Sequence, residues 1–151
     1  MIRLTKEDKN LYIAGFILGL GILGAIDGIV FHQLLQWHHM ILSPDIKLEI
    51  FTDGLFTAAF SALMVWGALK IFRDARNHEL GYSWKVFVSG TLIGGGVFNL
   101  VEGIIDHHIL QVHRVRPMAD NPLLYDLAFL ASGIVLILIG LWIKKLDKKA
   151  A

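Results

Sequence analysis

Four long apolar stretches are the feature that most constrains this 151-residue chain. A bilayer span needs about 20 mainly apolar residues, and the qualifying segments are roughly Leu11–Gln36, Leu48–Phe72, Val86–Asp106 and Leu123–Ile143. Inside lipid such a segment has to be a helix, because no water is present to satisfy its backbone groups. The sequence therefore predicts an all-α integral membrane protein, a four-helix transmembrane bundle that forms a single membrane domain over residues 1–151.

Composition agrees with this interpretation and excludes several other classes of protein. Hydrophobic residues make up 55% of the chain and charged residues 18%, which excludes a disordered chain. The chain has no cysteine, so disulfide frameworks, zinc fingers, thiolate sites and iron–sulfur clusters are excluded. A net charge of +1 argues against a nucleic-acid partner. The lipid bilayer is the partner that we expect.

The distribution of basic residues predicts the orientation of the bundle. Eleven of the 14 lysines and arginines fall on one side, in the N-terminal segment (Arg3, Lys6, Lys9), the middle connection (Lys70, Arg73, Arg76, Lys85) and the tail (Lys144, Lys145, Lys148, Lys149). Basic residues favour the cytoplasmic side. Both termini are therefore expected in the cytoplasm, and the first and third connections outside. The first span is too long for a cleaved signal peptide, and no small-residue cleavage site follows it.

An internal repeat relates the first and third spans. A shift of 75 positions places Asp27–His38 over Glu102–His113, and six of these twelve aligned positions are identical. Spans two and four align more weakly at an offset of 73, where Asp53, Phe56, Ala58 and Gly67 match Asp126, Phe129, Ala131 and Gly140. The sequence therefore predicts two parallel-repeat helical hairpins, about 11–72 and 86–146, which are related by an axis along the membrane normal.

The repeated segments carry polar residues that a helical wheel places on one arc of each span. At 100° per residue, Asp27, His32 and His38 share an arc of the first span; Glu102, Asp106, His107 and His113 share an arc of the third. The helical rise puts Asp27 and Glu102 about 7.5 Å deeper than His32 and His107, and His38 and His113 about 9 Å further out if the helices continue. Asp53 and Asp126 are expected near the His32 and His107 level. All four helices thus direct polar groups to one region near the outer face.

Ionisable groups within a bilayer cost several kcal/mol each unless they are paired or ligated. A divalent metal is the simplest shared partner, because neutral imidazole and ionised carboxylate are its ligands. Mixed ligands of this kind favour Fe, Zn or Mn over copper, and helix bundles hold two ions in this way, so the site is either mononuclear or dinuclear. The candidate ligands are His32, His107, Glu102, Asp27, Asp53, Asp126, Asp106, His38 and His113.

Each candidate also has a structural interpretation. The acids at Asp53 and Asp126 begin helices and could be N-caps, while Asp27 and Glu102 could orient the histidines rather than bind metal. The histidines could be hydrogen-bonded core or interfacial residues. Asp106 has no acidic counterpart in the first repeat, where Phe31 takes its place. This difference between the halves either creates an open coordination position at a metal or only fills space. The five-residue spacing from Glu102 to His107 lets one ion bind both only at a bend or from different sides.

The His-rich strings of both repeats resemble a bacterial membrane-protein family described only as predicted membrane proteins of unknown function. These strings are Asp27-Gly28 with Phe31-His32-Gln33-Leu34-Leu35-Gln36-Trp37-His38-His39-Met40, and Asn99-Leu100-Val101-Glu102-Gly103-Ile104-Ile105-Asp106-His107-His108 with His113-Arg114-Val115-Arg116-Pro117. The resemblance covers almost the whole chain. It implies a four-span protein of the bacterial inner membrane and a link with cytochrome oxidase assembly proteins, near which such genes are often found.

Four functions remain open at this point. The first is a metal-dependent oxidoreductase or hydrolase with a site opening outward. The second is a b-type haem protein with His32 and His107 as axial ligands. The third is a copper-handling assembly factor for a respiratory oxidase, which would use His38, His39, Met40 and Met118. The fourth is a proton or cation transporter that uses the intramembrane acids and histidines. A homo-oligomer is open as well, since small glycine-rich bundles often pair.

Overall fold

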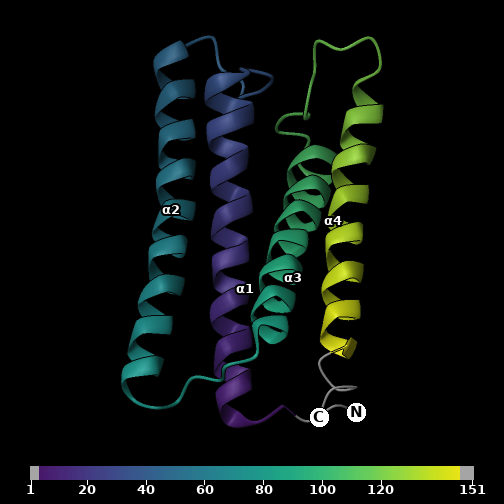
Figure 1. Ribbon diagram of the computed structural model, residues 1–151. Coiled ribbons are helices and arrows are strands. Elements are labelled where there is room, and N and C mark those ends of the chain that lie inside the picture. The colour runs from purple at the N-terminus through teal and green to yellow at the C-terminus, as the bar shows by residue number, and fades with distance from the viewer. Residues whose placement is uncertain (1–3, 147–151) are drawn as a thin grey trace.

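The computed structural model describes residues 4–146, and this part of the chain is helical without any strand. The helices are α1 (Lys6–Ile26), η1 (Asp27–Leu34), α2 (Ile46–Arg76), α3 (Trp84–Glu102), η2 (Gly103–Ile109) and α4 (Pro122–Leu146). Because η1 continues α1 and η2 continues α3, the molecule consists of four rods (Figure 1). Each rod is long and apolar enough to cross a membrane. The four-helix, all-α architecture is confirmed.

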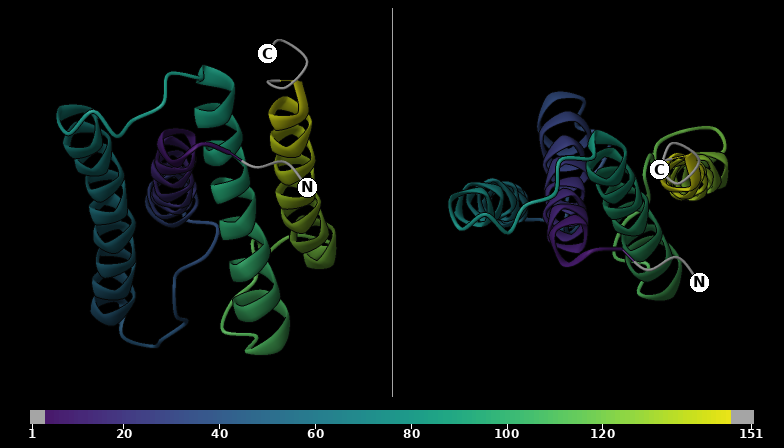
Figure 2. Two further views of the ribbon diagram at one scale, coloured as in Figure 1. Left: turned by 90° about the horizontal axis from the view of Figure 1, so that it is seen from below. Right: turned by 60° about the horizontal axis from the view of Figure 1, so that its bottom comes forward.

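The four rods have an inner pair and an outer pair. Helices α1 and α3 pack on each other, while α2 packs on α1 and α4 packs on α3 (Figure 2). Helix α1 begins and α4 ends at one end of the bundle, and the connections that follow η1 and η2 lie at the other end (Figure 1). The outer helices expose large apolar side chains such as Trp66, Phe72 and Trp142, as expected for a surface covered by lipid. Of the basic residues that predict orientation, Arg3, Lys148 and Lys149 lie outside the described residues.

The inner helices approach until backbone meets backbone. A methyl group at Gly19 would overlap the backbone carbonyl of Thr91, and one at Gly94 would overlap that of Phe16. Small residues allow this close approach, which is how membrane helices associate without a hydrophobic driving force. The two contacts are equivalent under the 75-residue shift, so the crossing places the ends of α1 and α3 symmetrically beside each other.

Hydrogen-bonding side chains fix where the helices begin. Asp45 caps α2, because its carboxylate accepts a hydrogen bond from the Lys47 amide at 3.0 Å. Thr5 caps α1 in the same way through the Asp8 amide at 3.1 Å. Asp53 lies about two turns inside α2 and is therefore not its N-cap. This corrects the capping interpretation of that residue.

Both inner helices widen into π-helix at the end near the first and third connections. In η1 and η2 the backbone bonds join residues five apart, a geometry often found at functional sites. Each π-helix is followed by a glutamine with positive φ, 49° at Gln36 and 50° at Gln111. A left-handed residue cannot continue a right-handed helix. The chain therefore reverses at these two residues and turns back over the helix end.

Candidate metal centre

The π-helices bring together acids and histidines that are five residues apart. In an α-helix such residues point about 140° apart, but in η1 the His32 Nε2 atom lies 3.1 Å from Asp27 Oδ2. The equivalent distance in η2, from His107 Nε2 to Glu102 Oε1, is 3.8 Å. The expectation that one ion could reach both residues only at a bend or from different sides is therefore corrected, because the wider helix aligns them.

The chain reversals return two further histidines to the same depth. The helical rise predicts His38 and His113 about 9 Å further out, on the condition that the helices continue. The helices do not continue, and the His38 ring lies 4.5 Å from the His32 ring between centroids. The His113 ring lies 4.8 Å from the His107 ring in the second half. All four imidazoles are buried.

The four rings form a compact group on the axis between the two halves. His38 and His113 stack with their centroids 4.7 Å apart and their planes 10° apart. Each of them also contacts the π-helical histidine of the opposite half at 6.1 Å, His38 with His107 and His113 with His32. We call these four histidines and the two buried acids the histidine–carboxylate cluster: Asp27, His32, His38, Glu102, His107 and His113.

Backbone carbonyls orient two of the imidazoles. The Nδ1 atom of His38 lies 2.8 Å from the carbonyl oxygen of Val115, and Nδ1 of His113 lies 3.1 Å from that of Met40. A carbonyl only accepts, so each Nδ1 carries the proton and donates it, which leaves the lone pair on Nε2. These Nε2 atoms face the acids, 3.9 Å from Asp27 and 3.6 Å from Glu102. This is how proteins orient a histidine that binds a metal.

Most of the buried polar side-chain atoms that lack a hydrogen-bond partner in the described residues belong to the cluster. Among the described residues, twelve buried side-chain nitrogen and oxygen atoms have no hydrogen-bond partner, and ten of them belong to the six cluster residues. Buried polar atoms are normally hydrogen-bonded, since leaving one unsatisfied costs about 1–3 kcal/mol. A metal ion that accepts a lone pair from each imidazole and each carboxylate would remove most of this cost.

The spacing of these atoms fits metal ligands better than hydrogen bonds. Two ligands that each lie about 2.1 Å from one ion are separated by roughly 3.0 Å when adjacent and by up to about 4.2 Å when opposite. Three of the four histidine–carboxylate distances in the cluster lie between 3.6 and 3.9 Å, beyond the usual hydrogen-bond range. His32, His38, Glu102 and His113 each present a donor atom, and these atoms all lie within 4.8 Å of one another. The donor set therefore fits a metal.

Asp53 and Asp126 lie next to the cluster with both carboxylate oxygens occupied. Asp53 accepts a hydrogen bond from the Met40 amide at 2.7 Å, and its other oxygen lies 2.7 Å from His39 Nδ1. Asp126 accepts from the Val115 amide at 3.0 Å and from Arg114 at 2.9 Å. These acids therefore hold the two loop segments whose carbonyls orient His113 and His38.

Asp106 lies beside Glu102 but outside the cluster. Its half-buried carboxylate lines a small cavity together with Glu102 and several apolar side chains. Asp106 is not among the residues whose donor atoms lie within 4.8 Å of one another. Of the nine predicted ligands, the structure thus brings six into one cluster, with Asp53 and Asp126 beside it and Asp106 at its edge.

His113 lies in the third connection, outside the spanning helices. Burial shifts the pKa of its imidazole. Removal from water lowers the pKa of His113 below its ordinary value of 6.5, although the hydrogen bond to the Met40 carbonyl acts in the opposite direction. A lowered pKa keeps the imidazole neutral at pH 7. Neutral imidazole is the form that binds a metal.

The residues that support the cluster were not predicted from the sequence. The carbonyls of Met40 and Val115, and the side chains of His39 and Arg114, take their places through the loop conformation rather than through residue type. A signal was present nonetheless, because 40 and 115, like 39 and 114, are related by the same 75-residue shift as the histidines.

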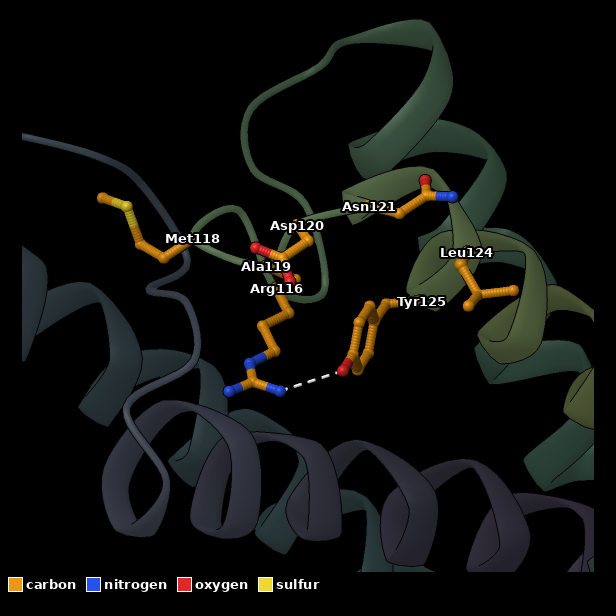
Figure 3. Close-up of a pocket in the computed structure, with 7 residues that line it drawn as sticks. All are labelled: Arg116, Met118, Ala119, Asp120, Asn121, Leu124 and Tyr125. Atoms are coloured by element: carbon orange, nitrogen blue, oxygen red, sulfur yellow. Dashed lines mark hydrogen bonds between the residues drawn. The ribbon is translucent and has the colours of Figure 1, made fainter.

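Two larger cavities lie near the same end of the bundle. One, of about 330 Å³, lies in the third connection, where Arg116 donates a hydrogen bond to the Tyr125 hydroxyl at 2.9 Å (Figure 3). None of the nine predicted ligands lines it. The other, of about 350 Å³, is lined in part by His32, His39 and Asp53. The second cavity therefore borders the cluster at His32.

Comparison with known proteins identifies the family but no activity. The family of the predicted membrane protein DUF2243 matches residues 14–147, and the chain belongs to it. No curated protein and no solved structure matches the chain. The chain is thus a membrane protein with a buried cluster of histidines and acids that could bind metal.

Proposed function

Within this family of predicted membrane proteins, we propose that the chain is a metalloprotein whose histidine–carboxylate cluster holds two divalent ions. The observation that carries the proposal is the concentration of ten unpartnered buried donor atoms in six residues. Among the described residues, the basic groups within 4 Å of these two carboxylates are histidines. A divalent metal would compensate both the negative charges and the unsatisfied lone pairs.

Each half of the repeat supplies one set of three ligands. By the 75-residue shift we assign Asp27, His32 and His38 to one ion and Glu102, His107 and His113 to the other. The four donor atoms within 4.8 Å of one another, from His32, His38, Glu102 and His113, come from both sets. Two imidazoles and one carboxylate per ion suit Fe, Zn or Mn. Asp53 and Asp126 act outside these sets by holding the loops, and Asp106 stays free of the metal.

Three protein ligands leave coordination positions open, so the proposed centre is catalytic rather than purely structural. A bound metal would supply either Lewis-acid activation of water or redox chemistry, which makes the protein a metal-dependent oxidoreductase or hydrolase. The residues of the chain hold the ligands at fixed angles and exclude bulk water from the buried cluster. The identity of the metal decides between the two classes.

The cluster geometry favours this function over haem or copper. The four imidazoles lie with neighbouring centroids 4.5–6.1 Å apart, and His38 stacks directly on His113, which leaves little room for a macrocycle between axial histidines. Copper(I) prefers soft sulfur ligands. Met118 is 94% exposed, and Met40 contacts the cluster through its carbonyl oxygen.

We also place the centre toward the outer face of a bacterial inner membrane. The cluster lies at the end of the bundle opposite the start of α1 and the end of α4 (Figure 1). The excess of basic residues is at that opposite end, which the positive-inside rule assigns to the cytoplasm. Cysteine accessibility at Asp120 and at His78, probed from outside intact cells, tests this orientation: labelling at residue 120 alone supports it, and labelling at residue 78 alone reverses it.

Elemental analysis of the purified protein, with an absorption spectrum of the same sample, tests the proposed function. We expect about two Fe, Zn or Mn ions per chain and no Soret band. The double variant His32→Ala/His107→Ala should lose the metal while it remains folded and membrane-inserted. Full metal content in that variant would place the metal elsewhere.

A further inference from the structure

A small apolar cavity lies beside the cluster within the membrane-spanning part of the bundle. Its volume is about 180 Å³, and its lining residues are Leu20, Phe56, Phe60, Phe98, Val101, Glu102 and Asp106. They come from α1, α2, α3 and η2, all parts of spanning rods. Val101 is 51% exposed on the surface of α3. The cavity therefore lies beside an exposed side chain of a spanning helix, on a surface that lipid is expected to cover.

Aromatic rings form the apolar wall of this cavity. Phe60 contacts Phe56 at 4.7 Å and Phe98 at 4.9 Å between centroids, and Phe56 and Phe98 are 6.3 Å apart. Such a wall offers edge and face contacts to another ring. An apolar cavity of roughly 150 Å³ is large enough to bind benzene. The size and the wall together fit one six-membered ring.

Two carboxylates form the polar end of the same cavity. Glu102 is 4% exposed, and neither of its oxygens has a hydrogen-bond partner. Asp106 makes no side-chain hydrogen bond to any described residue. Ionised carboxylates only accept hydrogen bonds. A ligand that fits here must combine an aromatic body with a group that donates a hydrogen bond.

Two residues that line the cavity have no equivalent in the other half of the repeat. The counterpart of Asp106 is Phe31, whose ring stacks on Trp37 at 5.2 Å. The counterpart of Phe60 is Gly133, which packs against Gly96 and Asn99. The repeat thus supplies two similar metal-ligand sets, but it does not repeat the carboxylate of Asp106 or the ring of Phe60, as expected if one face of the centre receives a substrate.

We propose that this cavity binds a lipid-dissolved aromatic alcohol of the phenol or hydroquinone type. The ring lies between the phenylalanines, and the hydroxyl donates a hydrogen bond to Asp106, beside Glu102 of the cluster. The inference names a substrate class for the proposed metal centre. The ligand's role as a substrate therefore rests on the proposed function. Binding itself requires only the cavity and its two acids.

The test uses the full chain in lipid nanodiscs and radiolabelled para-nonylphenol, with para-nonylanisole as the analogue that cannot donate. We expect the phenol to bind at least about tenfold more tightly than the ether, the effect of one buried hydrogen bond that the ether cannot make. Asp106→Leu should abolish this preference. Equal binding of the two probes to the wild-type protein would overturn the inference.

A pair of matched variants locates the binding site. Val101→Trp places a large ring at the mouth of the cavity and should prevent binding of both probes. Ile26→Trp makes the same change at the position that the 75-residue shift equates with Val101, on a residue of similar exposure at 44%, and should leave binding unchanged. If Val101→Trp binds the phenol as well as the wild type does, the ligand is not in this cavity.

Metal analysis of the same samples separates this inference from the proposed function. Protein that carries metal but shows no saturable phenol binding overturns the inference and leaves the metal centre standing. Protein that carries no metal after reconstitution, yet prefers the phenol in an Asp106-dependent way, supports the cavity as a ligand site and refutes the metal centre.

Discussion

Asp126 offers a sharp test of how the loops support the metal centre. In the structure its carboxylate accepts a hydrogen bond from the Val115 amide, and the Val115 carbonyl in turn orients His38 in the other half. Asp126→Ala leaves the buried Val115 amide without its partner, a cost of about 1–3 kcal/mol. Loss of such a supporting contact typically weakens metal affinity about 10–100-fold. The expected penalty for metal binding is therefore about 1.4–2.7 kcal/mol.

Competition with a chromophoric chelator measures this change in metal Kd on detergent-purified protein. Asp120→Ala, an exposed acid of the same connection, is the matched control and should bind metal as the wild type does. Circular dichroism and gel filtration confirm that both variants are folded. A metal Kd for Asp126→Ala within about threefold of wild type is well below the usual effect of a supporting residue, and it would refute the supporting role of Asp126. Complete loss of metal would instead make Asp126 a direct ligand.

Three further predictions concern the cluster and the backbone that shapes it. Asp27→Ala should lower metal content to about half, because each half of the cluster holds its own ion; elemental analysis that finds full content would count against Asp27 as a ligand. Gln36→Val should destabilise the protein by about 1–2 kcal/mol, since φ is positive there, whereas Gln36→Gly should not; equal thermal midpoints for the two variants would argue against a left-handed turn. Gly19→Leu should prevent the α1–α3 crossing and yield aggregated protein on gel filtration, while Gly54→Leu, which meets no neighbour within 4 Å, should elute like the wild type.

The sequence was sufficient for the fold because the membrane leaves few alternatives. Four apolar stretches of spanning length have to be helices in lipid, and short connections make neighbouring helices antiparallel. The glycines shared by the first and third spans pointed to close packing between them, and Gly19 and Gly94 do lie at the α1–α3 crossing. Length and small-residue pattern therefore determined the architecture.

The site was predicted in composition but not in geometry. A helical wheel assumes 100° per residue, so it could not show that η1 and η2 would widen and align Asp27 with His32. The left-handed turn at Gln36 carries no residue-type signal, because glutamine gives no special preference for positive φ. Without that turn, a continued helix would carry His38 away from His32 instead of against it.

The acids at the starts of the outer helices show a second limit. Residue type and depth suggested that Asp53 and Asp126 were ligands or caps. Their oxygens are instead taken up by backbone amides of Met40 and Val115, which reach them only because the chain reverses after each π-helix. A contact of this kind depends on loop conformation, and no periodicity in the sequence encodes it.

The central claim is that six buried residues hold metal at the meeting point of the two halves. Its most direct test compares metal content in wild type and His38→Ala/His113→Ala, measured by inductively coupled plasma mass spectrometry with the same protein preparation and lipid. The account predicts about two Fe, Zn or Mn ions per wild-type chain and almost none in the double variant, with both proteins folded. Wild-type protein without metal after reconstitution, or a double variant that retains the full amount, would contradict it.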